Sequence, residues 1–233
     1  MACLQFSIGV FNDIADAPRD RERFPPKPIP QGLVSIRRAR LVGAVLAGVG
    51  LLLVLPSGPA VLAVATAGLA LGLAYDFALS QTPWSWLPLA IAIPLVPLFA
   101  WLGASGSVTP SRLAIVPIGV LAGGALAVSN SLTDLEIDRA QGRRTVAVAL
   151  GPTRAWWVQA IGLVGAATLV ALVLPRDSAA VPLVIAGGSC LLLIGLLAVR
   201  STAAARSRLG WQFQAAGVAV LAVAWALATT KAG

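Results

Sequence analysis

Carboxylates gather at two places in a chain that is otherwise apolar and basic. Seven of the nine acidic residues fall in two short stretches, 13–22 and 134–138. At 100° per residue, the aspartates of the first stretch lie within about 60° of one another on a helix. In the second stretch two aspartates and an asparagine are four residues apart, which also predicts a shared helical face. These residues are Asp13, Asp16, Asp20, Asn130, Asp134 and Asp138.

Two carboxylate-bearing faces need a counter-charge. Like charges at helical spacing repel one another, and two such faces turned together at a membrane boundary would cost several kcal/mol without one. Oxygen ligands favour Mg²⁺ or Ca²⁺, and Mg²⁺ commonly shares its ligands with substrate phosphates. The pattern predicts a diphosphate bridged by Mg²⁺. The alternative is that these acids are solvated or paired with arginines. Pro18 can end the first helix, which would move Asp20 away from the others.

A few other side chains can take part in this chemistry. Lys27, Arg143 and Arg144 follow the two clusters closely enough to reach a phosphate, although they can also be ordinary loop charge. Tyr75 ends an apolar run and is either an interfacial anchor or a site hydroxyl. The chain has no histidine, which excludes Ser-His-Asp and Cys-His catalysis and the usual zinc sites.

The remaining acids predict less. We expect Asp76 and Asp177 to be solvated loop charges. Glu136 lies off the face of the second cluster, so we expect it to pair with a basic neighbour.

Composition places these residues in a membrane protein. Of 233 residues, 58% are apolar and 11% charged, whereas soluble domains carry about 25% charged residues. Apolar runs of about 20 residues predict a polytopic all-α transmembrane bundle. We expect one domain, 1–233, incomplete at its N-terminus, with a partial helix over 1–11 and a polar loop over 12–40. The seven predicted spans are 40–55, 59–78, 85–103, 112–132, 155–174, 179–199 and 209–229.

Basic residues predict the orientation of these spans. Fourteen of the 17 lysines and arginines fall in loops on one side, the side that carries both acidic stretches. By the positive-inside rule that side is cytoplasmic. We therefore expect a multi-pass protein of the cell inner (plasma) membrane with both acidic clusters at its cytoplasmic face. The net charge of +8 is explained by this loop bias, so no nucleic-acid partner is predicted. The opposite side carries Arg112, Arg176 and Lys231.

Two sequence motifs resemble those of a known family. The first is Asn12-Asp13-x-x-Asp16-x-x-x-Asp20 followed by Lys27-Pro28-Ile29-Pro30-Gln31-Gly32. It resembles the first aspartate-rich motif of the UbiA-type intramembrane prenyltransferases. The second motif of that family is similar to residues 130–138 followed by Arg139-Ala140-Gln141-Gly142-Arg143-Arg144-Thr145. The resemblance covers essentially the whole chain.

The resemblance implies a nine-helix bundle around a cavity that opens to lipid. Members transfer a prenyl group from an isoprenyl diphosphate donor to an acceptor, often aromatic, with Mg²⁺ as cofactor. It also implies that the metal stabilises the leaving group and that an apolar cavity shields an allylic carbocation from water. The metal sites would be carried by Asp13, Asp16, Asp134 and Asp138, with Asp20 beside them. Asn12 and Asn130 would complete the donor site.

Two other functions stay open. One is a non-catalytic member that binds prenyl lipid or a partner. Two features suggest it: Ser131 stands where many members have an aspartate, and the loop after Tyr75 has no basic residue. A cation transporter would use the same acids, but no acid continues a path through a span. The acceptor and the length of the donor chain are not predicted.

Overall fold

The computed structural model describes residues 1–22, 26–174, 180–201 and 203–230. Regular secondary structure in these ranges is entirely helical, and seven helices are long and apolar enough to cross a membrane. The all-α transmembrane prediction is confirmed. The seven are α2 (Ile36–Val54), α3 (Pro59–Ala74), α4 (Leu87–Ser105), α6 (Ile115–Thr133), α9 (Pro152–Val173), α10 (Ala180–Val199) and α11 (Ala204–Thr230). Arg23, Arg176, Asp177 and Lys231 lie outside the described residues.

The contacts divide the chain into two compact units. Unit 1 comprises residues 1–80 and 95–107, and unit 2 comprises 81–94 and 108–233. The boundary within α4 falls at Pro94, whose missing N–H removes one backbone hydrogen bond from the helix. The prediction of a single domain over 1–233 stays a prediction. Each unit is described by itself.

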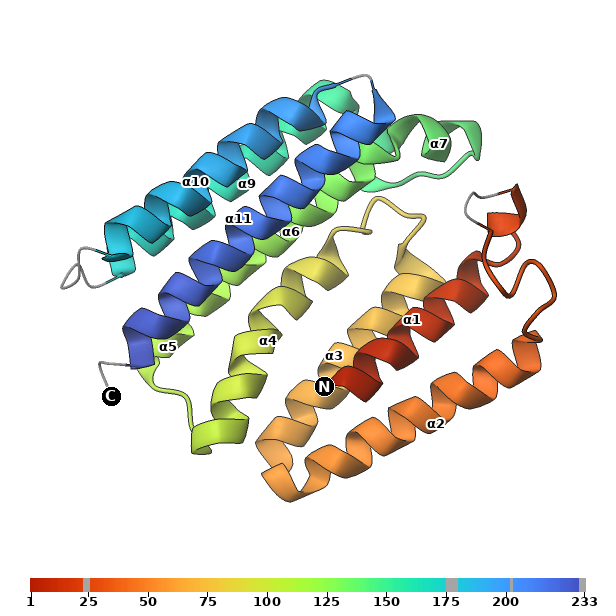
Figure 1. The fold of residues 1–233 in the computed structure, drawn as a ribbon, viewed down its shortest axis with the longest axis horizontal. Coiled ribbons are helices and arrows are strands. Elements are labelled where there is room, and N and C mark those ends of the chain that lie inside the picture. Colours follow the sequence, from red (N-terminus) through yellow and green to blue (C-terminus); the bar gives the residue numbers. More distant parts are fainter. Residues whose placement is uncertain (23–25, 175–179, 202, 231–233) are drawn as a thin grey trace. The chain divides into compact units, whose positions relative to one another are not determined.

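Unit 1 is built on α1 (Ala2–Asp16), which packs against α2 and α3 (Figure 1). Leu4 of α1 joins the buried core, and a Cβ added at Gly50 of α2 would lie 2.6 Å from a Leu4 methyl carbon. Ser7 donates a 2.8 Å hydrogen bond to the carbonyl of Gly43. The first helix thus fits closely because α2 presents glycines to it.

The first helix is longer than the sequence suggested. The polar loop was expected from residue 12, but α1 continues to Asp16. Residues 12–16 contain no helix breaker, and Pro18 then lacks the N–H that would continue the helical hydrogen bonds. The prediction of a loop over 12–40 is also wrong at its other end, because α2 begins at Ile36 with Ser35 as its N-cap.

Unit 2 contains four long helices, α6, α9, α10 and α11, which run side by side (Figure 1). Glycines allow α10 and α11 to approach closely, since a Cβ at Gly195 would lie 2.6 Å from the carbonyl oxygen of Gly210. Small residues at such contacts are typical of membrane helix pairs. Two indole N–H groups add polar contacts between helices: Trp156 donates to Leu196 O at 3.0 Å, and Trp211 donates to Leu126 O at 3.2 Å.

Two short helices stand at one end of unit 2, and the first of them carries Glu136 and Asp138 of the second acidic stretch. They are α7 (Leu135–Ala140) and α8 (Val146–Leu150). Gly142 and Gly151 have φ of 68° and 76°, so the turns after α7 and after α8 use backbone conformations that favour glycine. Pro152 follows at the first position of α9, where its missing N–H costs nothing.

Candidate functional site

The first cluster lies at the end of α1 and in the segment that follows it. Asn12, Asp13 and Asp16 belong to the last turns of the helix, whereas Asp20 begins a short 3₁₀ helix, Asp20–Glu22. The three aspartates therefore do not share one continuous helical face. The chain turns after Asp16, as Pro18 made possible, and Lys27 brings Asp20 back to Asp13.

Lys27 bridges two carboxylates of this cluster. Its Nζ lies 2.7 Å from Asp13 Oδ1 and 2.7 Å from Asp20 Oδ2. Burial alone would lower the pKa of Lys27, but its hydrogen bonds to Asp13 and Asp20 and their negative charges outweigh burial and raise that pKa above 10.5. The ammonium is therefore fully charged at neutral pH. A cation already occupies the space between these aspartates.

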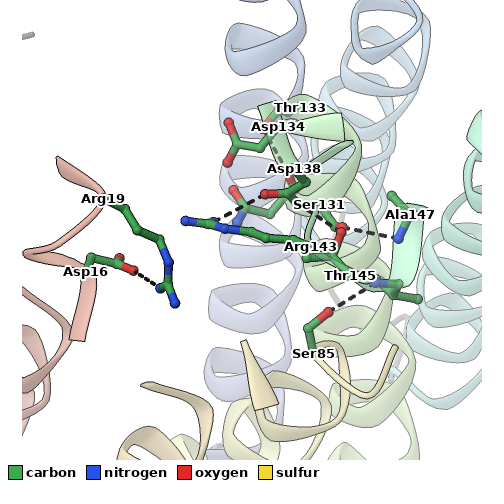
Figure 2. A network of polar contacts seen from close by, with 12 residues as sticks. Asp16, Arg19, Ser85, Ser131, Thr133, Asp134, Asp138, Arg143, Thr145 and Ala147 are labelled. Carbon is green, nitrogen blue, oxygen red and sulfur yellow. Dashed lines mark hydrogen bonds and ion pairs between the residues drawn. The ribbon is translucent and has the colours of Figure 1, made fainter. Parts of the chain in front are cut away.

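The other two residues of the first cluster have different partners. Asp16 pairs with Arg19 at 3.3 Å, and both side chains are partly exposed (Figure 2). Asn12 Nδ2 donates a 2.9 Å hydrogen bond to Oδ1 of Asp76. The prediction that Asp76 is a solvated loop charge is wrong, because the residue is only 5% exposed and lies in a π-helical segment, Tyr75–Leu79. Asp76 therefore fixes the Asn12 amide.

The second cluster is divided by a helix break. Helix α6 ends at Thr133, and Asp134 has φ −106° and ψ 9°, outside the helical region, before α7 begins. Asn130, Asp134 and Asp138 therefore belong to two helices, and the prediction of one continuous face is wrong. A 2.8 Å hydrogen bond from Asp138 N to Asp134 O retains one helix-like turn.

Asp138 is the buried member of this cluster. Its carboxylate accepts a 2.9 Å hydrogen bond from Thr145 Oγ1 and pairs with Arg143 Nη1 at 3.2 Å (Figure 2). Burial raises the pKa of Asp138, the Asp134 charge adds to this, and the contacts with Thr145 and Arg143 reduce it without cancelling it. Asp134 is more open: its side chain is 40% exposed, and Arg208 approaches it at 3.7 Å.

Two serines hold the segment that follows Asp138. Ser131 Oγ accepts the Ala147 N–H at 3.1 Å, and Ser85 Oγ accepts the Val146 N–H at 3.3 Å (Figure 2). Together they satisfy two N–H groups at the start of α8, which no residue of the preceding turn caps. The Ser131 hydroxyl, at a position where many family members have an aspartate, therefore accepts a backbone hydrogen bond.

The remaining predicted residues have simpler surroundings. Arg144 is exposed, and its backbone N–H donates to Gln81 O at 3.2 Å. Tyr75 is half-buried at the start of the π-helical segment. Glu136 pairs with Arg139 at 2.8 Å, which confirms the expected basic neighbour. Thr145, Ser85 and Asp76 were missed; only the position of Thr145, seven residues after Asp138, offered a signal.

Both clusters carry oxygen donors that suit a cation, although in neither cluster do these donors already surround one point. Among the described residues no three acidic, histidine or cysteine side chains converge on one point. Each of the five aspartates instead contacts a lysine or arginine. Their oxygen-only donor set suits a hard ion such as Mg²⁺, and the position of the Lys27 ammonium between Asp13 and Asp20 marks one place where positive charge is held.

A comparison with protein families matches residues 1–213 to the UbiA prenyltransferase family. The chain belongs to this family. Its UbiA-type motifs are thus part of a match that covers most of the sequence.

A similar protein is the 4-hydroxybenzoate octaprenyltransferase of Vibrio cholerae serotype O1 (strain ATCC 39541), 30% identical over 166 residues. That match covers 70% of this chain and 57% of the relative, so the chain spans little more than half the relative's length. The corresponding enzyme of Polaromonas sp. is 38% identical over 104 residues, 39% of this chain and 36% of that protein.

Solved structures of UbiA homologues have the same fold. The apo homologue from Aeropyrum pernix K1 matches with a TM-score of 0.72 and 21% identity, over 97% of this chain and 85% of that one. The Archaeoglobus fulgidus homologue bound to GPP and Mg²⁺ matches with a TM-score of 0.67 and 19% identity, over 96% and 84%.

Proposed function

We propose that this UbiA-family chain catalyses Mg²⁺-dependent transfer of a prenyl group from an isoprenyl diphosphate to an aromatic acceptor within the membrane. The observation that supports the proposal is the Lys27 ammonium, which lies within 2.7 Å of both Asp13 and Asp20 of the first aspartate motif. The A. fulgidus homologue, bound to GPP and Mg²⁺ in its structure, supports the donor and the ion.

In this proposal the five aspartates hold the metal and the diphosphate. They are Asp13, Asp16, Asp20, Asp134 and Asp138. Bound Mg²⁺ supplies positive charge that neutralises the diphosphate as it leaves. That the two clusters serve one diphosphate stays a prediction, which rests on the paired motifs.

The cations that now pair with these acids become phosphate ligands. With Asp13 and Asp20 holding a metal, Lys27 would be free to donate to a phosphate oxygen as a point charge. Arg143 can do the same with its planar guanidinium, and Arg144 is already exposed. Asn12, fixed by Asp76, and Asn130 are proposed to position the donor, and Tyr75 to line the same site.

The acceptor and the location are part of the proposal. The relatives named 4-hydroxybenzoate octaprenyltransferases support an aromatic acceptor of that type. The seven span-length helices support a multi-pass membrane protein, and the loop charges support an inner-membrane protein with both clusters on the cytoplasmic side. The apolar spans would keep water from the reacting prenyl group.

The direct test is transfer of a labelled prenyl group. The full chain in membranes would receive radiolabelled geranyl diphosphate, 4-hydroxybenzoate and Mg²⁺. Asp13→Asn and Asp134→Asn should each lower the rate by about 100-fold or more, because each removes charge that holds the leaving group. Glu136→Gln, a matched loss of one exposed charge beside the second cluster, should keep the rate. Full activity in both aspartate variants would refute the proposal.

A non-catalytic relative is the second candidate. It is favoured by one observation: Ser131, which stands where many family members have an aspartate, uses its hydroxyl to accept the Ala147 N–H. Retained Mg²⁺-dependent binding of the donor without turnover, across several aromatic acceptors, would support this alternative over the enzyme.

A further inference from the structure

A pocket of about 590 Å³ lies at the end of unit 2 where α6 and α10 finish and α9 and α11 begin. Figure 1 shows α7 at this same end of the four long helices. We call it the α9 pocket. All of its walls belong to unit 2: they come from the end of α6, from α7, from the first turns of α9, from the end of α10 with Arg200 and Ser201 after it, and from the start of α11. Its volume is within the range of small-molecule sites.

Two arginines give the α9 pocket a positive wall. Arg200 stacks on Trp156, with its guanidinium carbon 4.9 Å from the ring centroid. Arg208 reaches Asp134 only at 3.7 Å and is 58% exposed, which makes that ion pair weak. A guanidinium carries five N–H donors, so neither contact uses up the hydrogen-bonding capacity of these side chains.

Helix α9 adds further donors to the same wall. Pro152 and Thr153 of its first turn line the pocket, and no side chain caps the helix there. Uncapped N–H groups and the helix dipole favour an anion at such an end. Hydroxyl groups of Thr153 and Ser201 lie in the lining. The one acid of the lining, Glu136, is neutralised by Arg139 at 2.8 Å.

Another part of the lining is apolar and continues along the outside of α9. Trp157 belongs to the pocket and is 57% exposed. Ile161 and Val164 follow at helical spacing and are also exposed. An exposed apolar stripe therefore leads from the pocket along a span-length helix, in the direction that acyl chains take in a bilayer.

We propose that the α9 pocket binds an anionic membrane phospholipid, with its phosphate between Arg200 and Arg208 and its chains along the Trp157 stripe. The location supports this ligand, because the pocket lies at the ends of predicted spans, where lipid phosphates are found. Basic pockets between membrane helices are suited to anionic headgroups, and tryptophan is favoured at the membrane interface. This inference does not require prenyl transfer, although Arg208 also pairs with Asp134 of the second cluster.

The test is lipid retention by the full chain. The protein is equilibrated with phosphatidylglycerol and phosphatidylcholine at equal concentrations, and bound lipid is measured by native mass spectrometry. The wild type should prefer phosphatidylglycerol. In the double variant Arg200→Gln, Arg208→Gln this preference should fall about tenfold, because two positive charges at the phosphate are removed. Arg154→Gln is the matched control. Arg154 is exposed and lies in the first turn of α9 beside Thr153, but it is outside the lining, so its loss should change the preference less than about twofold.

Further measurements distinguish a bound lipid from free phosphate, and they distinguish loss of the binding site from unfolding. Trp157→Ala should weaken phosphatidylglycerol retention while leaving the direct binding of glycerol phosphate unchanged. Each single arginine variant should lose part of the preference, and thermal melts in phosphatidylcholine identify any variant that fails to fold. No preference in the wild type, or equal losses in the double variant and Arg154→Gln, would overturn the proposal. Glycerol phosphate binding as tightly as phosphatidylglycerol would overturn the assignment to a lipid.

Discussion

The Lys27 ammonium donates a 2.7 Å hydrogen bond to Asp13, fourteen residues earlier in the chain. Its second carboxylate partner, Asp20, is nearly buried. The lysine therefore neutralises two residues of an aspartate motif that, in our proposal, holds Mg²⁺. Metal and lysine compete for the same oxygens, which leads to the first prediction.

Lys27→Met should make the stability of the protein depend more strongly on Mg²⁺. Without the lysine, Asp13 and Asp20 repel each other in the absence of metal, and bound Mg²⁺ relieves that repulsion. The rise in melting temperature between EDTA and saturating Mg²⁺ should be larger than in the wild type. Arg38→Met, which removes an exposed charge at the start of α2, serves as the control. An unchanged Mg²⁺ response in Lys27→Met would contradict the assignment of the cation site.

Thr145→Val should destabilise the segment around Asp138. The substitution keeps the shape of the side chain but removes the hydroxyl that donates to a buried carboxylate, at a cost of about 1.5–3 kcal/mol. Thr145→Ser retains the donor and should recover most of this loss. Unfolding in a denaturing detergent series measures both variants. Equal stability of the valine and serine variants would show that the Thr145 hydroxyl does not stabilise the folded protein.

The titration of Asp138 should be visible in the pH dependence of stability in EDTA. Burial raises its pKa in the folded protein above the usual 3.8, so the folded state binds the proton more tightly than the unfolded state. The Asp138 contribution to the free energy of unfolding therefore falls as pH rises from 3.8 through the raised pKa, and is constant above it. Asp138→Asn should lack this decrease. A difference between wild type and variant that does not vary over this range would contradict the expected direction.

Asp76 should act on the donor through Asn12. Asp76→Ala removes the acceptor of the Asn12 amide, whereas Asp76→Asn keeps an oxygen at the same place. We expect the alanine variant to raise KM for the isoprenyl diphosphate about tenfold and the asparagine variant to raise it less. Steady-state kinetics at several donor concentrations separate KM from kcat. Equal KM values in wild type and alanine variant would remove Asp76 from donor positioning.

Gly195→Ala should disrupt the packing of α10 on α11. The added Cβ would lie 2.6 Å from the backbone oxygen of Gly210, which cannot move away without separating the helices. We expect a loss of about 1–3 kcal/mol. Gly187→Ala, on the same helix, meets nothing within 4 Å and should be neutral. Thermal unfolding of both variants in detergent compares them, and similar behaviour of the two would contradict close packing at Gly195.

The spans could largely be predicted from sequence, because apolar runs set them. In the first cluster Pro18 signalled that Asp20 could leave the helix, but the two contacts of Lys27 with Asp13 and Asp20 were not predicted. The break at Asp134 could not, since no proline or glycine stands there and helical spacing continues across it. The burial of Asp76 was also hidden: it depends on Asn12, 64 residues earlier, and on a local π-helical turn. Long-range hydrogen bonds from distant segments, such as that between Ser85 and Val146, leave no periodic signal in a single sequence.

Mg²⁺-dependent binding of labelled geranylgeranyl diphosphate to the purified full chain tests the central claim most directly. The account predicts binding in Mg²⁺ that is lost in EDTA and is weakened at least about tenfold by Asp13→Ala and by Asp134→Ala. Glu136→Gln should bind as the wild type does. Equal binding in EDTA and in Mg²⁺, or undiminished binding by both alanine variants, would contradict it.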